Sequence, residues 1–323
     1  MNDATLPSSR IKNFPVAWFS MIMGFTGFAI AWMRAETVYD VGFAPSCVLR
    51  WVALGLFALV AACYLVKIVR YPQQVLEEFR HPVKQAFGPA ISIAMILLSI
   101  ALRHDAPRLS FWLWSVGTVL HLALTLYVMS SWIHHTKYEI THMNPAWFIP
   151  VVGNILVPIA GVHHAPVEVS WFFYSVGLFF WPVLTAILFY RLIFHTSLPE
   201  RFVPTLFIFI APPAVGFISW HALGGQVDAF AHVLYGVALF FALLLAVQVS
   251  YFVRLKFFLS WWAYSFPLAA LTIATLIWAQ EDGSGFYRSL GAVLLALLTL
   301  LIVLLLVRTA IAVARREICV EGH

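Results

Sequence analysis

Histidine is the residue type here with the widest chemistry, because a neutral imidazole can ligate a metal or a haem iron. The chain has 12 histidines, including the doublets His134-His135 and His163-His164. Both doublets are expected in loops, and the spacing identifies no pair that would face each other across two helices. No metal, cofactor or nucleophile motif is present, so we expect no metal site, no cofactor and no catalytic residue. A haem-bearing redox protein stays open as an alternative suggested by the histidine count alone.

Charged side chains could move protons or ions across a membrane, and their positions decide whether they do. All 14 Asp and Glu residues fall in the tails, loops or ends of the spans predicted below. No Lys or Arg is predicted near mid-depth either. The sequence therefore argues against a carboxylate proton relay and against an acidic ring that would select cations.

Small polar groups are what the middle of the apolar segments offers to an anion instead. Hydroxyls, amides and exposed backbone N–H groups bind anions weakly, and weak binding suits rapid passage. The same groups can simply hold helices together, and both roles stay open for each one. The possible pore-lining residues are Ser20, Gly24, Ser92, Asn154, Ser219, Ser265 and Thr272.

The elements that carry these groups are membrane helices. Hydrophobic residues make up 62% of the 323 residues and charged residues 10%, and the mean hydropathy is +0.90. A soluble domain would be about one quarter charged. A span needs about 20 apolar residues, and strand periodicity is absent, so we predict an all-α integral membrane protein. Residues 1–323 form one transmembrane domain with ten spans, at 14–33, 46–69, 84–103, 109–131, 145–162, 167–194, 202–222, 229–252, 259–279 and 285–313.

Basic residues then orient the predicted spans. With the N-terminus in the cytoplasm, 14 of the 19 Lys and Arg residues fall on the cytoplasmic side and 5 on the other side. The positive-inside rule thus favours ten spans with both termini in the cytoplasm. These charges flank apolar segments, so we expect contact with a lipid bilayer and no binding of nucleic acid.

Prolines divide the spans into two kinds. Proline removes a backbone donor, and the freed carbonyl groups are tolerated in a membrane only where protein or water satisfies them. Odd-numbered spans rich in proline should therefore lie inside and regular even-numbered spans outside. The simplest arrangement is five hairpins in a ring, with the odd helices around a central axis. The predicted helix kinks are Pro89, Pro150, Pro158, Pro212, Pro213 and Pro267.

The ninth span places a bulky ring directly before such a proline, in the stretch SWWAYSFPLAALTIATL from Ser260 to Leu276. A break at Pro267 lets the Phe266 ring leave the helix flank and point toward the axis. An apolar constriction there would resist ions, because removing their water is costly. Two interpretations of Phe266 follow from the residues alone, a plug in a pore or ordinary packing.

Several stretches, in order along the chain, resemble one family. They are FPVAWFSMIMG in the first span, HPVK before the third, THMNPAWFIPVVGN opening the fifth, LPERFVPTLFIFIAPPAVG across the seventh and WWAYSFPLAALTIAT in the ninth. Together they are similar to bacterial TehA proteins and plant slow-type anion channels, the tellurite-resistance/dicarboxylate transporter family.

The resemblance implies ten helices in quasi-fivefold hairpins, with the odd helices lining a pore. It also implies a homotrimer in the inner (plasma) membrane with one pore per subunit. The family's gating phenylalanine matches Phe266 in the ninth-span motif. The transported anions that the resemblance implies are chloride, nitrate, malate, sulfite and tellurite.

The leading hypothesis is therefore a passive channel for small inorganic or organic anions, with a neutral pore gated by Phe266. The alternative is a proton-coupled transporter or exporter of oxyanions such as tellurite and sulfite, or of C4-dicarboxylates such as malate. That alternative comes from the resemblance, since no coupling residue is visible in the sequence.

Overall fold

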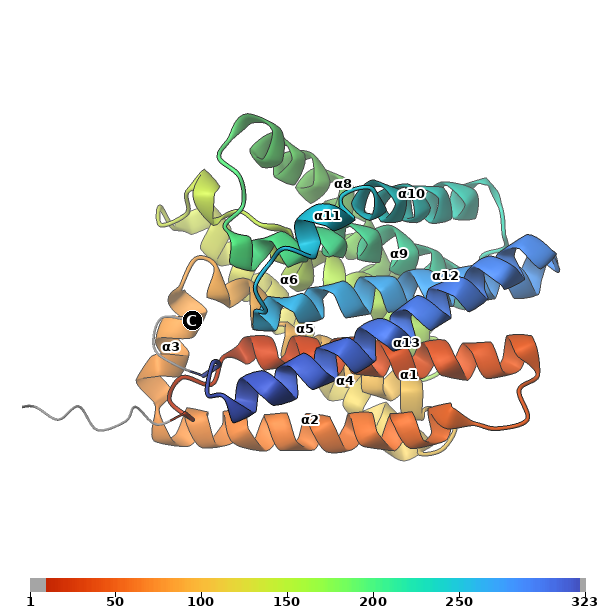
Figure 1. Ribbon diagram of the computed structural model, residues 1–323, viewed down its shortest axis with the longest axis horizontal. Coiled ribbons are helices and arrows are strands. Elements are labelled where there is room, and N and C mark those ends of the chain that lie inside the picture. Colours follow the sequence, from red (N-terminus) through yellow and green to blue (C-terminus); the bar gives the residue numbers. More distant parts are fainter. Residues whose placement is uncertain (1–9, 320–323) are drawn as a thin grey trace, which may run out of the picture.

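The computed structural model describes residues 10–319, and every regular element in that part of the chain is a helix (Figure 1). The α-helices are α1 (Phe19–Tyr39), α2 (Pro45–Arg70), α3 (Pro72–Arg80), α4 (Ala90–Leu102), α5 (Pro107–His134), α6 (Phe148–Val152), α7 (Pro158–Gly161), α8 (Val167–Phe194), α9 (Ala211–Ala222), α10 (Ala229–Ala246), α11 (Val249–Phe252), α12 (Ser265–Asp282) and α13 (Gly285–Ala314). The 3-10 helices are η1 (Val16–Trp18), η2 (Lys84–Phe87), η3 (Ile140–His142), η4 (Pro145–Trp147), η5 (Gly153–Leu156), η6 (Glu200–Ile210) and η7 (Leu259–Tyr264).

Helices long and apolar enough to cross a membrane account for most of the described chain. Nine helical runs within residues 10–319 meet this requirement, and the tenth predicted span is the shorter apolar run Pro145–Gly161. That run is interrupted because Pro150, Gly153 and Pro158 fall within 17 residues, so it is built from four short helices. The protein is thus an all-helical membrane protein, with nine long apolar helices and one broken one in the part of the chain that the structure describes.

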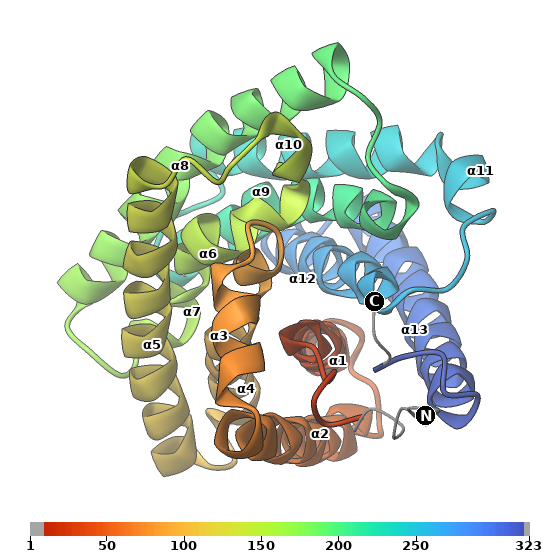
Figure 2. The ribbon, with the colours of Figure 1, turned by 90° about the vertical axis from the view of Figure 1, so that its left-hand side faces the viewer.

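Burial separates the odd-numbered spans from the even-numbered ones. The most apolar 18 residues of the four long odd spans are 72–83% buried, against 22–39% for the five even spans. In Figure 2, where α1 and α2 are seen nearly end-on, α2, α5, α8 and α13 lie toward the outside and α1 and α12 lie inside. The proline pattern predicted this difference, because helices with interrupted backbone bonding need protein around them.

Each odd span changes from a 3-10 helix to an α-helix along its length. The pairs are η1 and α1, η2 and α4, η4 and α6, η6 and α9, and η7 and α12. The predicted kink prolines lie at or near these changes. Pro89 caps α4, Pro212 and Pro213 are in the first turn of α9, and Pro267 is the third residue of α12. Proline fits there because first-turn N–H groups lack an intrahelical acceptor.

Packing follows chain order. Each inner segment contacts the outer helix that follows it. Examples are the contacts of α1 with α2, α4 with α5, α9 with α10 and α12 with α13. The inner segments also contact one another. In sequence, α1 contacts α4, α4 contacts η5, η5 contacts α9, α9 contacts α12 and α12 contacts α1.

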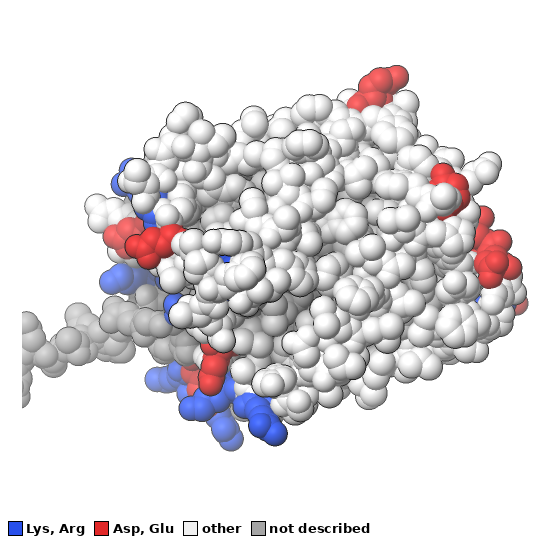
Figure 3. Space-filling model, turned by 90° about the horizontal axis from the view of Figure 1, so that it is seen from above, with Lys and Arg blue, Asp and Glu red and all other residues white. Residues whose placement is uncertain are grey.

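Charged residues are confined to the two ends of the face in Figure 3, and the band between them is uncharged. Lys and Arg gather at the left-hand end of this view, whereas Asp and Glu dominate the opposite end. An uncharged belt of this kind matches the hydrocarbon core of a bilayer.

Candidate functional site

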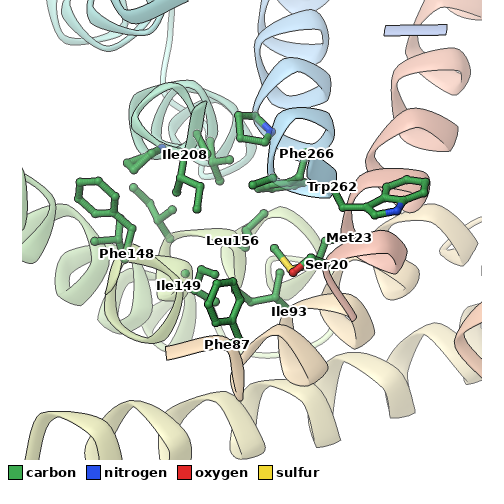
Figure 4. A pocket seen from close by; sticks show the side chains of 18 residues that line it. Ser20, Met23, Phe87, Ile93, Phe148, Ile149, Leu156, Ile208, Trp262 and Phe266 are labelled. Carbon is green, nitrogen blue, oxygen red and sulfur yellow. The ribbon is translucent and has the colours of Figure 1, made fainter. Parts of the chain in front are cut away.

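A small cavity lies where the inner segments converge, and we call it the constriction (Figure 4). Its volume is about 60 Å³, and 18 residues line it. All five odd-numbered spans contribute, for example Met23 from α1, Ile93 from α4, Leu156 from η5, Ile208 from η6 and Phe266 from α12. The constriction is therefore a junction of the inner helices and not a pocket between one pair.

The wall of the constriction is almost entirely apolar. None of its 18 lining residues is ionisable, and the one side-chain hydroxyl is that of Ser20. Trp262 also lines it, but its indole Nε1 donates a hydrogen bond to Thr309 Oγ1 on α13, 3.0 Å away, so that the N–H points outward. An ion in this space would have little to replace its water.

The Phe266 ring reaches from α12 into this cavity (Figure 4). A side-chain carbon built on Gly27 of α1 would lie 3.3 Å from Cδ2 of the ring, so the ring lies close to α1. Because the ring is held at the start of α12, directly after the 3-10 helix η7, the change of helix type sets its direction.

Ser20 is the one predicted lining residue that lies on the wall of the constriction. Four of the other predicted hydroxyls are buried and donate to backbone carbonyl oxygens. Ser92 donates to Pro89 O at 2.8 Å, Ser265 to Trp262 O at 2.6 Å and Thr272 to Leu268 O at 2.7 Å. The hydroxyl of Ser219 donates to Ile155 O. These bonds satisfy the donors within the helix bundle.

Asn154 and Gly24 also serve packing contacts. The amide of Asn154 donates to Val151 O at 2.7 Å and to Thr125 Oγ1 at 3.0 Å. A side-chain carbon on Gly24 would lie 1.8 Å from Ser265 Oγ, so glycine is what allows α1 to approach α12. Both residues frame the constriction from behind its wall.

A second, larger cavity adjoins the constriction, and we call it the vestibule. Its volume is about 340 Å³, and it shares Ser20, Phe87 and Ala263 with the constriction. Its wall carries three basic side chains, His81 after α3, Lys84 of η2 and Arg201 of η6, together with the carboxylates Glu78 and Glu317. Sequence reasoning did not identify it, although Lys84 and His81 belong to the HPVK motif.

A buried ion pair supports the vestibule wall. Lys67 Nζ of α2 lies 2.7 Å from Glu78 Oε2 of α3, and both side chains are nearly inaccessible. Lys67 also donates to Phe14 O at 2.8 Å, and Val16 N donates to Glu78 Oε1 at 2.7 Å. The pair thus fixes the start of η1, and it neutralises Glu78, one of the two carboxylates that line the vestibule.

His81 reports the electrostatic character of the vestibule. Partial burial lowers the pKa of His81, and the positive charges of Lys84, His142, Arg201 and Lys137 lower it further. Two of these basic groups, Lys84 and Arg201, line the vestibule together with His81. Within residues 10–319, no cluster of three or more His, Cys, Asp or Glu side chains is arranged to hold a metal ion.

The apolar constriction walled by all five inner segments and the vestibule next to it lie within a multi-pass membrane protein. The SLAC1 family, described as voltage-dependent anion channel, matches residues 13–310, and the chain belongs to this family. It is a plasma-membrane family of channels and not of enzymes, as the resemblance of the motifs had implied.

Individual relatives come from plants, archaea and bacteria. The chain is 31% identical to the S-type anion channel SLAH3 of Arabidopsis thaliana, over 96% of this chain and 50% of that protein. It is 27% identical to the uncharacterized transporter MJ0762 of Methanocaldococcus jannaschii, over 83% of this chain and 85% of that protein. It is 24% identical to the tellurite resistance protein TehA homolog of Haemophilus influenzae, over 80% of this chain and 79% of that protein. The chain spans about half the length of SLAH3.

Proposed function

We propose that this protein is a passive anion channel in which the Phe266 ring closes a neutral pore. The observation that carries the proposal is the position of that ring, inside an apolar cavity to which all five odd spans contribute. Removing the water of an ion in such an apolar space costs free energy. The constriction therefore resists conduction until the ring moves. Chloride and other small anions are the proposed cargo.

The proposed pore runs between five inner segments arranged as a quasi-fivefold ring. The closed succession of contacts from α1 through α4, η5, α9 and α12 back to α1 supports this arrangement. The deep burial of the odd spans supports it as well. In this arrangement the outer helices shield the inner backbone, which is interrupted at its proline-marked changes of helix type.

We propose that both termini lie in the cytoplasm, so that the vestibule is the cytoplasmic mouth of the pore. The gathering of Lys and Arg at one end of the molecule (Figure 3) supports this orientation, as does the position of Pro15 and Cys319 on the vestibule wall. Cytoplasmic anions would then meet the basic vestibule before the constriction.

The direct test is anion current through purified protein in planar bilayers, with chloride at different concentrations on the two sides. We expect the Phe266→Ala form to carry at least roughly ten times the current of the parent. Removing about 1.4 kcal/mol from the barrier to ion passage raises the rate tenfold. The reversal potential should lie near the chloride equilibrium potential. Phe286→Ala is the matched control, because Phe286 is 65% exposed on the outer helix α13.

A coupled carrier of oxyanions or C4-dicarboxylates is the second candidate. It is favoured by relatives that are named as a transporter and as a tellurite resistance protein. Flux into proteoliposomes with and without a pH gradient separates the two. Accumulation of sulfite or malate against its own gradient, driven by protons, would replace the channel proposal.

We also propose a homotrimer, which rests on the family resemblance. Chemical cross-linking of the protein in membranes should give a limiting species of three chains, and a limiting species of one chain would contradict it.

A further inference from the structure

The vestibule differs from the constriction in size. Its volume of about 340 Å³ is more than five times the 60 Å³ of the constriction. A space of 60 Å³ has room for only a few water molecules, at about 10–15 Å³ for each. The vestibule can therefore hold a polyatomic anion with part of its water, whereas the constriction cannot.

The positive charges of the vestibule are not balanced by its carboxylates. Lys84 and Arg201 have no carboxylate partner among the described residues, and the Arg201 guanidinium lies over the Phe202 ring at 4.9 Å. Two carboxylates line the vestibule. Glu78 is bound to Lys67 at 2.7 Å, and Glu317 lies 4.0 Å from Arg315.

We propose that the vestibule binds small divalent anions, and that a divalent anion held there blocks the passage of monovalent anions. The site would take a dicarboxylate or a divalent oxyanion such as sulfate. This inference rests on the proposed channel function, because block requires a conducted ion.

Charge is the reason for the preference. The attraction between a divalent anion and a fixed cation is twice that of a monovalent anion at the same distance. Lys84 offers a compact charge and Arg201 a planar fork that matches two oxygen atoms. Their placement on η2 and η6 puts them on separate segments of one cavity wall, where the two ends of a dicarboxylate can each find a cation.

Retention follows from the next step along the pore. A divalent ion has a much larger hydration energy than a monovalent one. The apolar wall of the constriction makes no polar contacts that could replace the lost water. A bound dianion therefore leaves by the way that it came. While it stays, it occupies a cavity that adjoins the constriction.

The experiment uses chloride current through the full-length Phe266→Ala form in planar bilayers, with sulfate or succinate added to one side at a time at constant ionic strength. We expect block from the vestibule side only, with half-block at millimolar concentration. Combining Lys84→Gln with Arg201→Gln should raise the half-blocking concentration at least tenfold. Arg70→Gln is the matched control, because Arg70 is a basic residue of the same end that does not line the vestibule.

Two results would overturn the proposal. One is an unchanged half-blocking concentration in the Lys84→Gln/Arg201→Gln form, and the other is a reversal potential showing that the divalent anions themselves carry the current. If sulfate blocks and succinate does not, the site is one for oxyanions, and the opposite result makes it a dicarboxylate site.

Calorimetric titration of the purified parent protein with sulfate and succinate keeps the test independent of conduction. Binding that is weakened by the Lys84→Gln/Arg201→Gln pair supports the site even in a protein that carries no current. Absence of current in the Phe266→Ala form contradicts the proposed channel, whereas chloride current that no divalent anion reduces contradicts the vestibule site alone.

Discussion

The constriction and the vestibule share Ser20, Phe87 and Ala263, yet the rest of their walls differ in kind. The constriction offers a single hydroxyl among aliphatic and aromatic side chains, with the Phe266 ring inside it. The vestibule offers the cations Lys84 and Arg201 from two segments, in a space where water can remain. The difference shows how a channel can attract anions without holding them. The charge lies where ions keep their water, and the barrier lies where they must lose it, so the two properties can be changed separately.

Removing one partner of the buried ion pair should disturb the vestibule most. Glu78→Gln leaves the Lys67 ammonium buried without its carboxylate, and breaking such a pair costs about 3–5 kcal/mol. We expect a clear fall in the unfolding temperature in detergent. The double change Lys67→Met/Glu78→Leu should lose much less, because it leaves no unpaired charge. Equal losses in the two forms would mean that the pair itself is unimportant.

Closing the gap at Gly24 should disturb the constriction by displacing α12 from α1. In Gly24→Ala the new carbon would lie 1.8 Å from Ser265 Oγ, and overpacking of this kind costs about 1–3 kcal/mol or more. Gly55→Ala on the outer helix α2 is the control, since nothing lies within 4 Å of its added carbon. Thermal unfolding of both forms checks the difference. A Gly24→Ala protein as stable as Gly55→Ala would contradict the close approach of α1 and α12.

Making the constriction polar should reduce its contrast with the vestibule. Leu156→Asn places amide donors on the wall, and a hydrogen bond to a charged group contributes about 1.5 kcal/mol or more. We expect roughly tenfold more chloride current than in Leu156→Ala, which enlarges the space without adding a donor. Similar currents in the two variants would show that size alone limits conduction.

Salt should weaken the vestibule and leave the constriction unaffected. The screening length falls from about 10 Å at 0.1 M to about 3 Å at 1 M salt. The conductance divided by the chloride activity should therefore fall by roughly two- to threefold between 0.1 M and 1 M salt in a protein that keeps Lys84 and Arg201. The same measurement with Lys84→Gln/Arg201→Gln should show almost no fall, and an equal fall would place the attraction elsewhere.

Hydrophobicity and length made the outer helices easy to predict. The span expected at 167–194 is helix α8, Val167–Phe194, since nothing interrupts its apolar run strongly enough to end it. Proline placement also predicted which spans are buried. The broken span Pro145–Gly161 and the short helix α3 were harder. Helix α3 is too polar to be recognised as a span, although Pro72 at its start and the spacing of Val75 and Phe79 are helix signals.

Phe266 was the residue of the candidate site that the sequence predicted best. Phe266 could be singled out because of the proline beside it and the ninth-span motif, and its ring does line the constriction. Ser20 also lies on the wall, but the other predicted hydroxyls do not, because Ser and Thr in helices often bond a carbonyl three or four residues earlier, as Ser92, Ser265 and Thr272 do. The vestibule depends on contacts between segments far apart in sequence, so composition could not reveal it.

The most direct measurement is single-channel conductance across a size series at position 266, with the parent and the Leu, Val and Ala forms in identical bilayers. If the ring closes the pore, conductance should rise stepwise from Phe to Leu to Val to Ala while the anion selectivity stays unchanged. Folded Phe266→Ala protein that conducts no more than the parent would contradict the account.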